Sequence, residues 1–115
     1  MSVDIHLEKL RGHPKFYKLL EEIAKLHNDK NSDYASAKEP LSNFTRVGKW
    51  CKEYKLVTEG NEAEKVCIIY ALKQLDAALA LLMKKEKGIV EGRKQRFIDD
   101  AVYFLIASIL DEEGL

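Results

Sequence analysis

The feature that most constrains this chain is a long stretch with helical periodicity, from about residue 62 to residue 87. Its apolar side chains recur at spacings of three and four residues, which places them on overlapping faces of an α-helix. They are Val66, Ile69, Tyr70, Leu72, Leu75, Leu79, Leu82 and Met83. A helix that is apolar on more than one face must be covered by other elements, so we expect it to be a central helix.

The same periodicity predicts helices on both sides of this segment. A first helix is expected from about Pro14 to Asn31, followed by a loop that reaches Pro40. A shorter helix capped by Ser42 and a last helix over about residues 90–112 complete the set. No segment alternates apolar and polar residues as a strand does. The sequence therefore predicts an all-α bundle of about four helices.

The length of the chain and its helical pattern indicate a single domain. The 115 residues suit a single domain over 1–115, and residues 1–12, which lie outside the helical pattern, are candidates for disorder. The last predicted helix carries two apolar stripes, which need two partners. We therefore expect a homo-oligomer, a dimer or larger, in which another subunit covers one stripe.

Charge and composition exclude several partners. Nineteen basic and nineteen acidic residues cancel, which removes the electrostatic drive toward nucleic acid. Cys51 and Cys67 lack the neighbours of a zinc site and are expected to be reduced core thiols. No signal peptide is visible, and the apolar run 101–110 is about half of the ~20 residues that span a membrane. We expect a cytoplasmic protein without a membrane partner.

The run Lys30-Asn31-Ser32-Asp33-Tyr34 is the main candidate for a ligand site, because it gathers polar residues where the first helix should end. It supplies a cation for phosphate, an amide, a carboxylate and a ring for stacking, as a nucleotide pocket requires. The same residues also make an ordinary polar turn, and that alternative stays open.

Three carboxylates are candidate metal ligands. Asp76 lies among apolar residues in the central helix, either paired with Lys73 or directed into a polar cleft that binds a divalent cation. On the last helix, Glu91 and Asp99 fall near the same edge, although a helix-dipole role and pairing with an arginine are the simpler explanations. Carboxylates suit Mg²⁺, with Mn²⁺ as the alternative.

The segments Lys30-Asn31-x-Asp33-Tyr34-Ala35, Asn43-Phe44 and Asp99-x-Ala101-x-Tyr103 resemble a family of small phage-associated helical proteins of unknown function. That family is similar to the all-α nucleoside triphosphate pyrophosphatases of the MazG-like superfamily. The resemblance implies an oligomeric bundle that handles nucleotides in a virus or the cytoplasm of its host. The chain lacks the E-x-x-E and E-x-x-D pairs of those enzymes, so its metal site would be built differently.

Two functions follow as hypotheses. In the first, a Mg²⁺-dependent nucleotide pyrophosphohydrolase or nucleotide-binding protein holds its metal with Asp76, Glu91 and Asp99. Its substrate pocket is formed by Lys30, Asn31, Asp33, Tyr34, Asn43, Lys73 and Tyr103. In the second, the chain is a non-enzymatic interaction or assembly protein of phage origin whose carboxylates are only ion-paired.

Overall fold

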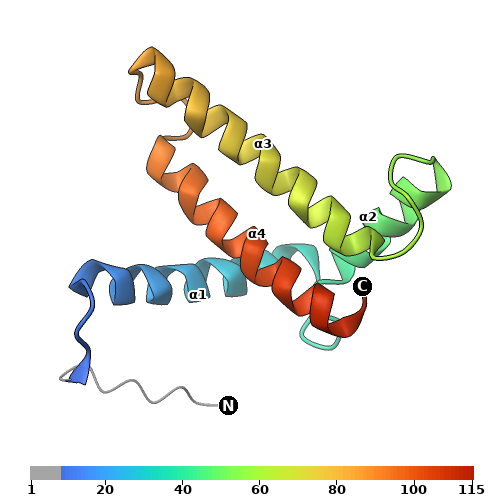
Figure 1. The fold of residues 1–115 in the computed structure, drawn as a ribbon. Coiled ribbons are helices and arrows are strands. Elements are labelled where there is room, and N and C mark those ends of the chain that lie inside the picture. The colour runs from blue at the N-terminus through green and yellow to red at the C-terminus, as the bar shows by residue number, and fades with distance from the viewer. Residues whose placement is uncertain (1–8) are drawn as a thin grey trace.

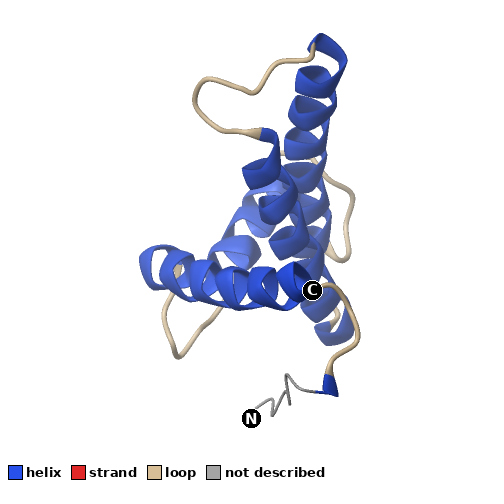
Figure 2. Cartoon of the chain, turned by 90° about the vertical axis from the view of Figure 1, so that its left-hand side faces the viewer, coloured by secondary structure: helices blue, strands red, loops and turns tan. Residues whose placement is uncertain are grey.

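The computed structural model describes residues 9–115, and these form four helices and no strand (Figures 1 and 2). In chain order the helices are α1 (Pro14–Tyr34), α2 (Ser42–Glu53), α3 (Glu62–Lys84) and α4 (Arg93–Glu113). The prediction of an all-α fold with four helices is thereby confirmed. For residues 1–8 the expected disorder lies outside the described part of the chain.

The helices are arranged around one antiparallel pair. α3 and α4 run side by side and make the largest contact of the fold (Figure 1). α2 packs on the first half of α3, and α1 lies across α4, with a smaller contact. The central position predicted for the helix from residue 62 is confirmed, because α3 joins α2 to α4.

Several helix ends differ from the sequence prediction: α3 ends at Lys84 rather than near residue 87, and α4 begins at Arg93 rather than near residue 90. α1 continues to Tyr34, and the backbone N–H of Ala35 still donates to the carbonyl of Asn31 at 2.8 Å. The expected exit near Lys30 was therefore wrong, because no Gly or Pro interrupts the pattern before Pro40. Ser42 does not cap α2: its hydroxyl accepts from Arg46 Nη1 at 3.3 Å, and the N-cap is Leu41, in the left-handed region at φ 66°.

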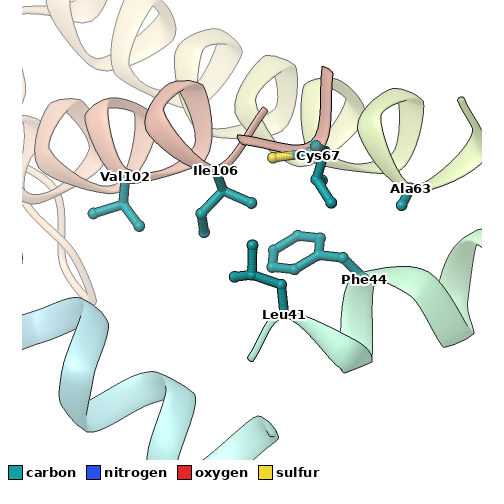
Figure 3. Close-up of a cluster of buried hydrophobic side chains, with 7 residues drawn as sticks. Leu41, Phe44, Ala63, Cys67, Val102 and Ile106 are labelled. Atoms are coloured by element: carbon teal, nitrogen blue, oxygen red, sulfur yellow. The ribbon is translucent and has the colours of Figure 1, made fainter. Parts of the chain in front are cut away.

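The core lies where α2, α3 and α4 meet (Figure 3). Its buried apolar residues are Leu41, Phe44, Ala63, Cys67, Val102, Ile106 and Leu110. α2 and α3 approach closely, since a Cβ built on Gly48 would lie 2.8 Å from the backbone nitrogen of Ala63. This approach holds the start of α2 beside α4, where the candidate site lies.

The single chain is more open than most domains of its size. Its radius of gyration is 16.2 Å, compared with about 13 Å for a compact chain of this length. α3 is also long and apolar enough, by length and composition alone, to cross a membrane, although one of its faces packs on α2 and α4. Much of the apolar surface of α3 is therefore left uncovered within one chain.

Candidate functional site

The last turns of α1 place most of the Lys30–Tyr34 run on one face. Because a residue rotates about 100° around a helix axis, Lys30, Asn31 and Tyr34 share the face of His27, whereas Asp33 points elsewhere. That face lines a cavity of about 410 Å³. The site thus depends on the continuation of α1 that the sequence analysis did not predict.

All four helices contribute to the wall of this cavity. Six of the predicted substrate and metal residues line it together: Lys30, Asn31, Tyr34, Asn43, Asp99 and Tyr103. The remaining wall was not predicted and consists of His27, Leu41, Phe44, Val47, Tyr70, Val102 and Ile106. Most of the second group is apolar, so the cavity combines a polar end with a hydrophobic wall.

Asp99 is the centre of the polar end. It is only 4% exposed, and a buried carboxylate is costly unless it is paired and hydrogen-bonded. Its Oδ1 lies 3.5 Å from Lys30 Nζ and accepts from Gln95 Nε2 at 3.0 Å. Gln74 Nε2 donates to Oδ2 at 3.0 Å. One cation and two amides therefore hold this carboxylate between α1, α3 and α4.

A second polar layer fixes the position of Gln74. Arg96 Nη1 donates to Gln74 Oε1 at 2.7 Å and lies 3.6 Å from Glu91 Oε2. Because Gln74 accepts with its oxygen, its amide nitrogen is directed to Asp99. An arginine was one predicted partner of Asp99, but in the structure Arg96 reaches Asp99 only through Gln74. The contact of Gln95 with Asp99 could have been predicted, because the two residues are four positions apart on one helix. The contact of Gln74 with Asp99 could not, because no local sequence pattern indicates it.

Asp100, next to Asp99, is buried differently. It is 6% exposed, and among the described residues its Oδ1 has no hydrogen-bond partner. Burial raises the pKa of its carboxyl above the ordinary value, and the charge of Asp99 adds to this. The two neighbouring carboxyls therefore have different surroundings, with partners around Asp99 and an unsatisfied oxygen on Asp100.

The hydrophobic wall contains three aromatic rings in mutual contact. The centroid of Phe44 lies 6.1 Å from that of Tyr70 and 6.4 Å from that of Tyr103, and the two tyrosines are 5.9 Å apart. These separations are typical of edge-to-face and tilted aromatic pairs. Burial raises the pKa of Tyr103, and the nearby charge of Asp99 raises it further, so its hydroxyl stays protonated as a donor at neutral pH.

Two asparagines lie at the start of α2. Asn31 Oδ1 accepts from the backbone N–H of Leu41 at 3.3 Å, which leaves the amide N–H₂ group of Asn31 as a donor beside the cavity. Asn43 lies in the first turn of α2, whose N-terminus has no side-chain cap. In that turn the backbone N–H groups of Ser42 and Phe44 already donate to backbone carbonyls, at 3.2 and 3.0 Å. The donors at the α2 end of the cavity are therefore the side-chain amide groups of Asn31 and Asn43.

Four predicted site residues lie outside the cavity lining: Asp33, Lys73, Asp76 and Glu91. Lys73 and Asp76 are exposed on α3, and Asp33 is exposed on α1. Glu91 lies before α4, where it contacts Arg96.

Within residues 9–115, no three side chains of His, Cys, Asp or Glu lie close enough to hold a metal ion. The set Asp76, Glu91 and Asp99 therefore forms no metal site in one chain. The binding of Mg²⁺ or Mn²⁺ stays a prediction.

Comparison with known proteins adds no identification. No protein-family model matches the chain, and neither a curated protein nor a solved structure matches it. The resemblance to small phage-associated proteins consequently rests on the short segments quoted above. The geometry of the cavity is the basis for a functional proposal.

Proposed function

We propose that the cavity binds a nucleotide and that the protein acts in nucleotide metabolism of a phage or its host. The observation that carries this proposal is that one cavity of about 410 Å³ joins an aromatic wall to polar side chains of both kinds, the donors Lys30, Asn31 and Asn43 and the acceptor Asp99. Cavities of roughly 300–1,000 Å³ suit small organic ligands, which are held by apolar contact and a few placed polar groups. A nucleotide has a flat aromatic base and an anionic phosphate, and therefore needs both ends.

The wall offers places for each part of the ligand. A base would stack beside Tyr70 and Tyr103, near the carboxylate of Asp99, which accepts from ring N–H or amino groups. The phosphate would lie toward Lys30 and the side-chain amide groups of Asn31 and Asn43. Lys30 Nζ is 3.5 Å from Asp99 and 42% of its side chain is exposed, so it can turn from the carboxylate to a phosphate oxygen.

Binding is proposed ahead of hydrolysis for a structural reason. Pyrophosphate release of the predicted kind requires a metal ion, and residues 9–115 of one chain do not gather three side chains that would hold it. The alternative of a non-enzymatic interaction or assembly protein differs from our proposal in its expected response to nucleotides. Under that alternative, no nucleotide stabilises the native state.

The test is thermal unfolding of the full chain with nucleoside mono-, di- and triphosphates, each with EDTA or with millimolar Mg²⁺. A ligand at ten times its Kd adds about 1.4 kcal/mol to the native state, which raises Tm by several degrees. Pyrophosphate release from the same panel shows whether binding leads to turnover. No shift with any nucleotide would contradict the proposal.

Matched lysine variants connect a shift to the cavity. For each variant, the rise in Tm is measured against the Tm of the same variant without ligand. Lys30→Gln should lose most of the rise that a nucleotide causes, because it removes a cation that lines the cavity. Lys25→Gln, on the same helix but outside the cavity lining, is the control and should keep the shift. Equal shifts in both variants would place the nucleotide elsewhere.

A further inference from the structure

The carboxylate of Asp99 keeps acceptor capacity that the fold does not use. The two oxygens of a carboxylate offer about four acceptor positions. Among residues 9–115, Oδ1 accepts from Gln95 Nε2 at 3.0 Å and lies 3.5 Å from Lys30 Nζ. Oδ2 accepts from Gln74 Nε2 at 3.0 Å. One position on Oδ2 is therefore open to a ligand, and a second opens on Oδ1 when Lys30 moves away.

Lys30 is the partner that can leave Asp99. Its contact with Oδ1 is longer than the about 2.7–2.9 Å of a strong charge-assisted hydrogen bond, and 42% of its side chain is exposed. Lys30 and Asp99 both line the cavity, whereas Gln74 and Gln95 do not. Gln74 is also fixed by Arg96 Nη1 at 2.7 Å. A phosphate that draws Lys30 away thus leaves a carboxylate held by two amides, with one free position on each oxygen.

Two neighbouring acceptor positions distinguish among the nucleobases. Guanine carries two donors side by side, the ring N1–H and the 2-amino group. In adenine and cytosine the amino group lies beside a ring nitrogen that only accepts, and in uracil the ring N–H lies between two carbonyl oxygens. With any of these three bases, an acceptor would face the second oxygen of the carboxylate and repel it. Guanine therefore matches both oxygens of Asp99 at once.

We propose that the cavity selects guanine nucleotides, whose N1–H and 2-amino groups donate to the two oxygens of Asp99. The inference rests on the proposed nucleotide binding, because it names the base that this site takes. In the same arrangement the phosphate takes over Lys30, so the two ends of the ligand act together. Asp99 is thereby the residue that determines base specificity.

The cavity also offers donors for the remaining polar atom of guanine, the carbonyl oxygen O6. The hydroxyl of Tyr103 and the free amide N–H₂ group of Asn31 both belong to side chains that line the cavity. The charge of Asp99 acts on Tyr103, which shows that the two side chains are neighbours. Asp99 is only 4% exposed, so a base beside it is largely removed from water, where each unpaired donor or acceptor is costly.

The first experiment is isothermal titration calorimetry of the full chain with mono- and triphosphates of guanosine, inosine, adenosine, cytidine and uridine, each with EDTA or Mg²⁺. Inosine is the closest comparison, because its base differs from guanine only by the missing 2-amino group. At equal phosphate number, guanosine nucleotides should bind roughly 10- to 100-fold more tightly than inosine nucleotides, the range expected for one hydrogen bond to a charged group. The preference over adenosine should be at least 100-fold.

The panel separates failure of this inference from failure of the proposed function. Equal affinities for guanosine and inosine nucleotides, or tighter binding of adenosine, cytidine or uridine nucleotides, would overturn the guanine assignment while nucleotide binding stands. Binding of no nucleotide would contradict the proposed function itself, and the guanine assignment with it.

An exchange of specificity tests the role of Asp99. Asp99→Asn replaces one acceptor by a donor, which matches xanthine, because xanthine carries a carbonyl oxygen in place of the 2-amino group. The variant should bind guanosine nucleotides at least tenfold more weakly than the parent chain does, and should prefer xanthosine nucleotides. A gain for xanthosine cannot arise from damage to the fold, and circular dichroism shows whether the helices are kept.

Asp29→Asn is the matched control, because it makes the same change at an exposed position of α1 outside the cavity lining. It should keep the base preference of the parent chain. A folded Asp99→Asn variant with the parent's ratio of guanosine to xanthosine affinity would overturn the proposal and leave Asp99 as an ion-pair partner of Lys30 alone. If the variant does not fold, the inosine and adenosine comparisons with the parent chain decide.

Discussion

The two faces of α3 differ in what covers them: one packs against other helices of the same chain, and the other is exposed. The inner face places Gln74 against α4 and Tyr70 against α2, and Gln74 finds hydrogen-bond partners within the chain. The outer face carries Leu72, Leu75 and Leu79, which the other described residues leave 57%, 37% and 49% exposed. The inner face is thus stabilised by folding alone, whereas the outer face can gain stability only by association. Stability of the first kind is independent of protein concentration, and stability of the second kind is not.

The largest effect should come from the inner face. Phe44 is 7% exposed in the core, so Phe44→Ala should lower the free energy of unfolding by about 3–4 kcal/mol at every protein concentration. Leu75→Ala should act mainly through association, and its cost should therefore change with concentration. Urea unfolding at 1 and 50 μM compares the two variants. A concentration-independent cost for Leu75→Ala as large as that for Phe44→Ala would break the distinction between the faces.

Thiol labelling sharpens the same distinction on the inner face. Cys67 is fully buried, its thiol donates to the carbonyl of Tyr103 at 2.9 Å, and burial raises its pKa from 9.0 to about 11. The reactive thiolate should therefore be about 100-fold rarer than for an ordinary thiol. Mass spectrometry after iodoacetamide treatment at pH 8 should show modification of the partly exposed Cys51 first. Equal labelling rates would mean that the inner face opens readily.

The close contact of α2 with α3 gives a smaller effect. Gly48→Ala would place a Cβ 2.8 Å from the backbone nitrogen of Ala63, where no flexible side chain can move away. We expect a loss of about 1–3 kcal/mol in the free energy of unfolding. Gly92→Ala is the control, because its nearest neighbour would lie at 3.7 Å, and it should cost about 1 kcal/mol or less, as the loss of a glycine N-cap. A similar cost for the two variants would contradict the close approach.

Local pattern was enough to predict the helices but not their ends. The three- and four-residue spacing around Leu72 and Leu79 predicted α3, which the structure confirms. The end of α1 was misplaced because Asn31, Ser32 and Asp33 are common in turns, yet Asn31 Oδ1 accepts from the backbone N–H of Leu41 and the helix continues through all three residues. Tertiary contact outweighs a weak local preference for a turn.

The cavity was only partly predictable for a related reason. Lys30, Asn31 and Tyr34 stand close together in the sequence, so their shared role was visible there. The contact of Asp99 with Gln74 joins residues 25 positions apart, and periodicity alone does not say which glutamine meets which carboxylate. Lys73 and Asp76 were conspicuous as charges among leucines, but the sequence cannot show which face of α3 the fold covers. Their position on the uncovered face emerged only from the packing of α2 and α4.

The smallest effect concerns a carboxyl pair at the first turn of α3. A side-chain hydrogen bond with Asp111 raises the pKa of Glu64 above 4.5, because this bond requires a proton, and desolvation adds to the rise. The folded chain therefore binds this proton more tightly than the unfolded chain does, and stability falls as the pH rises from about 4.5 through the folded pKa. Glu64→Gln keeps a donor without the charge, so it should raise Tm slightly at pH 7 and lose this advantage near pH 4. Thermal unfolding from pH 4 to 8 measures the difference, with Glu112→Gln, at an exposed position on α4, as the control. A gain that is the same at both ends of the range would show that charge repulsion with Asp111 is not its cause.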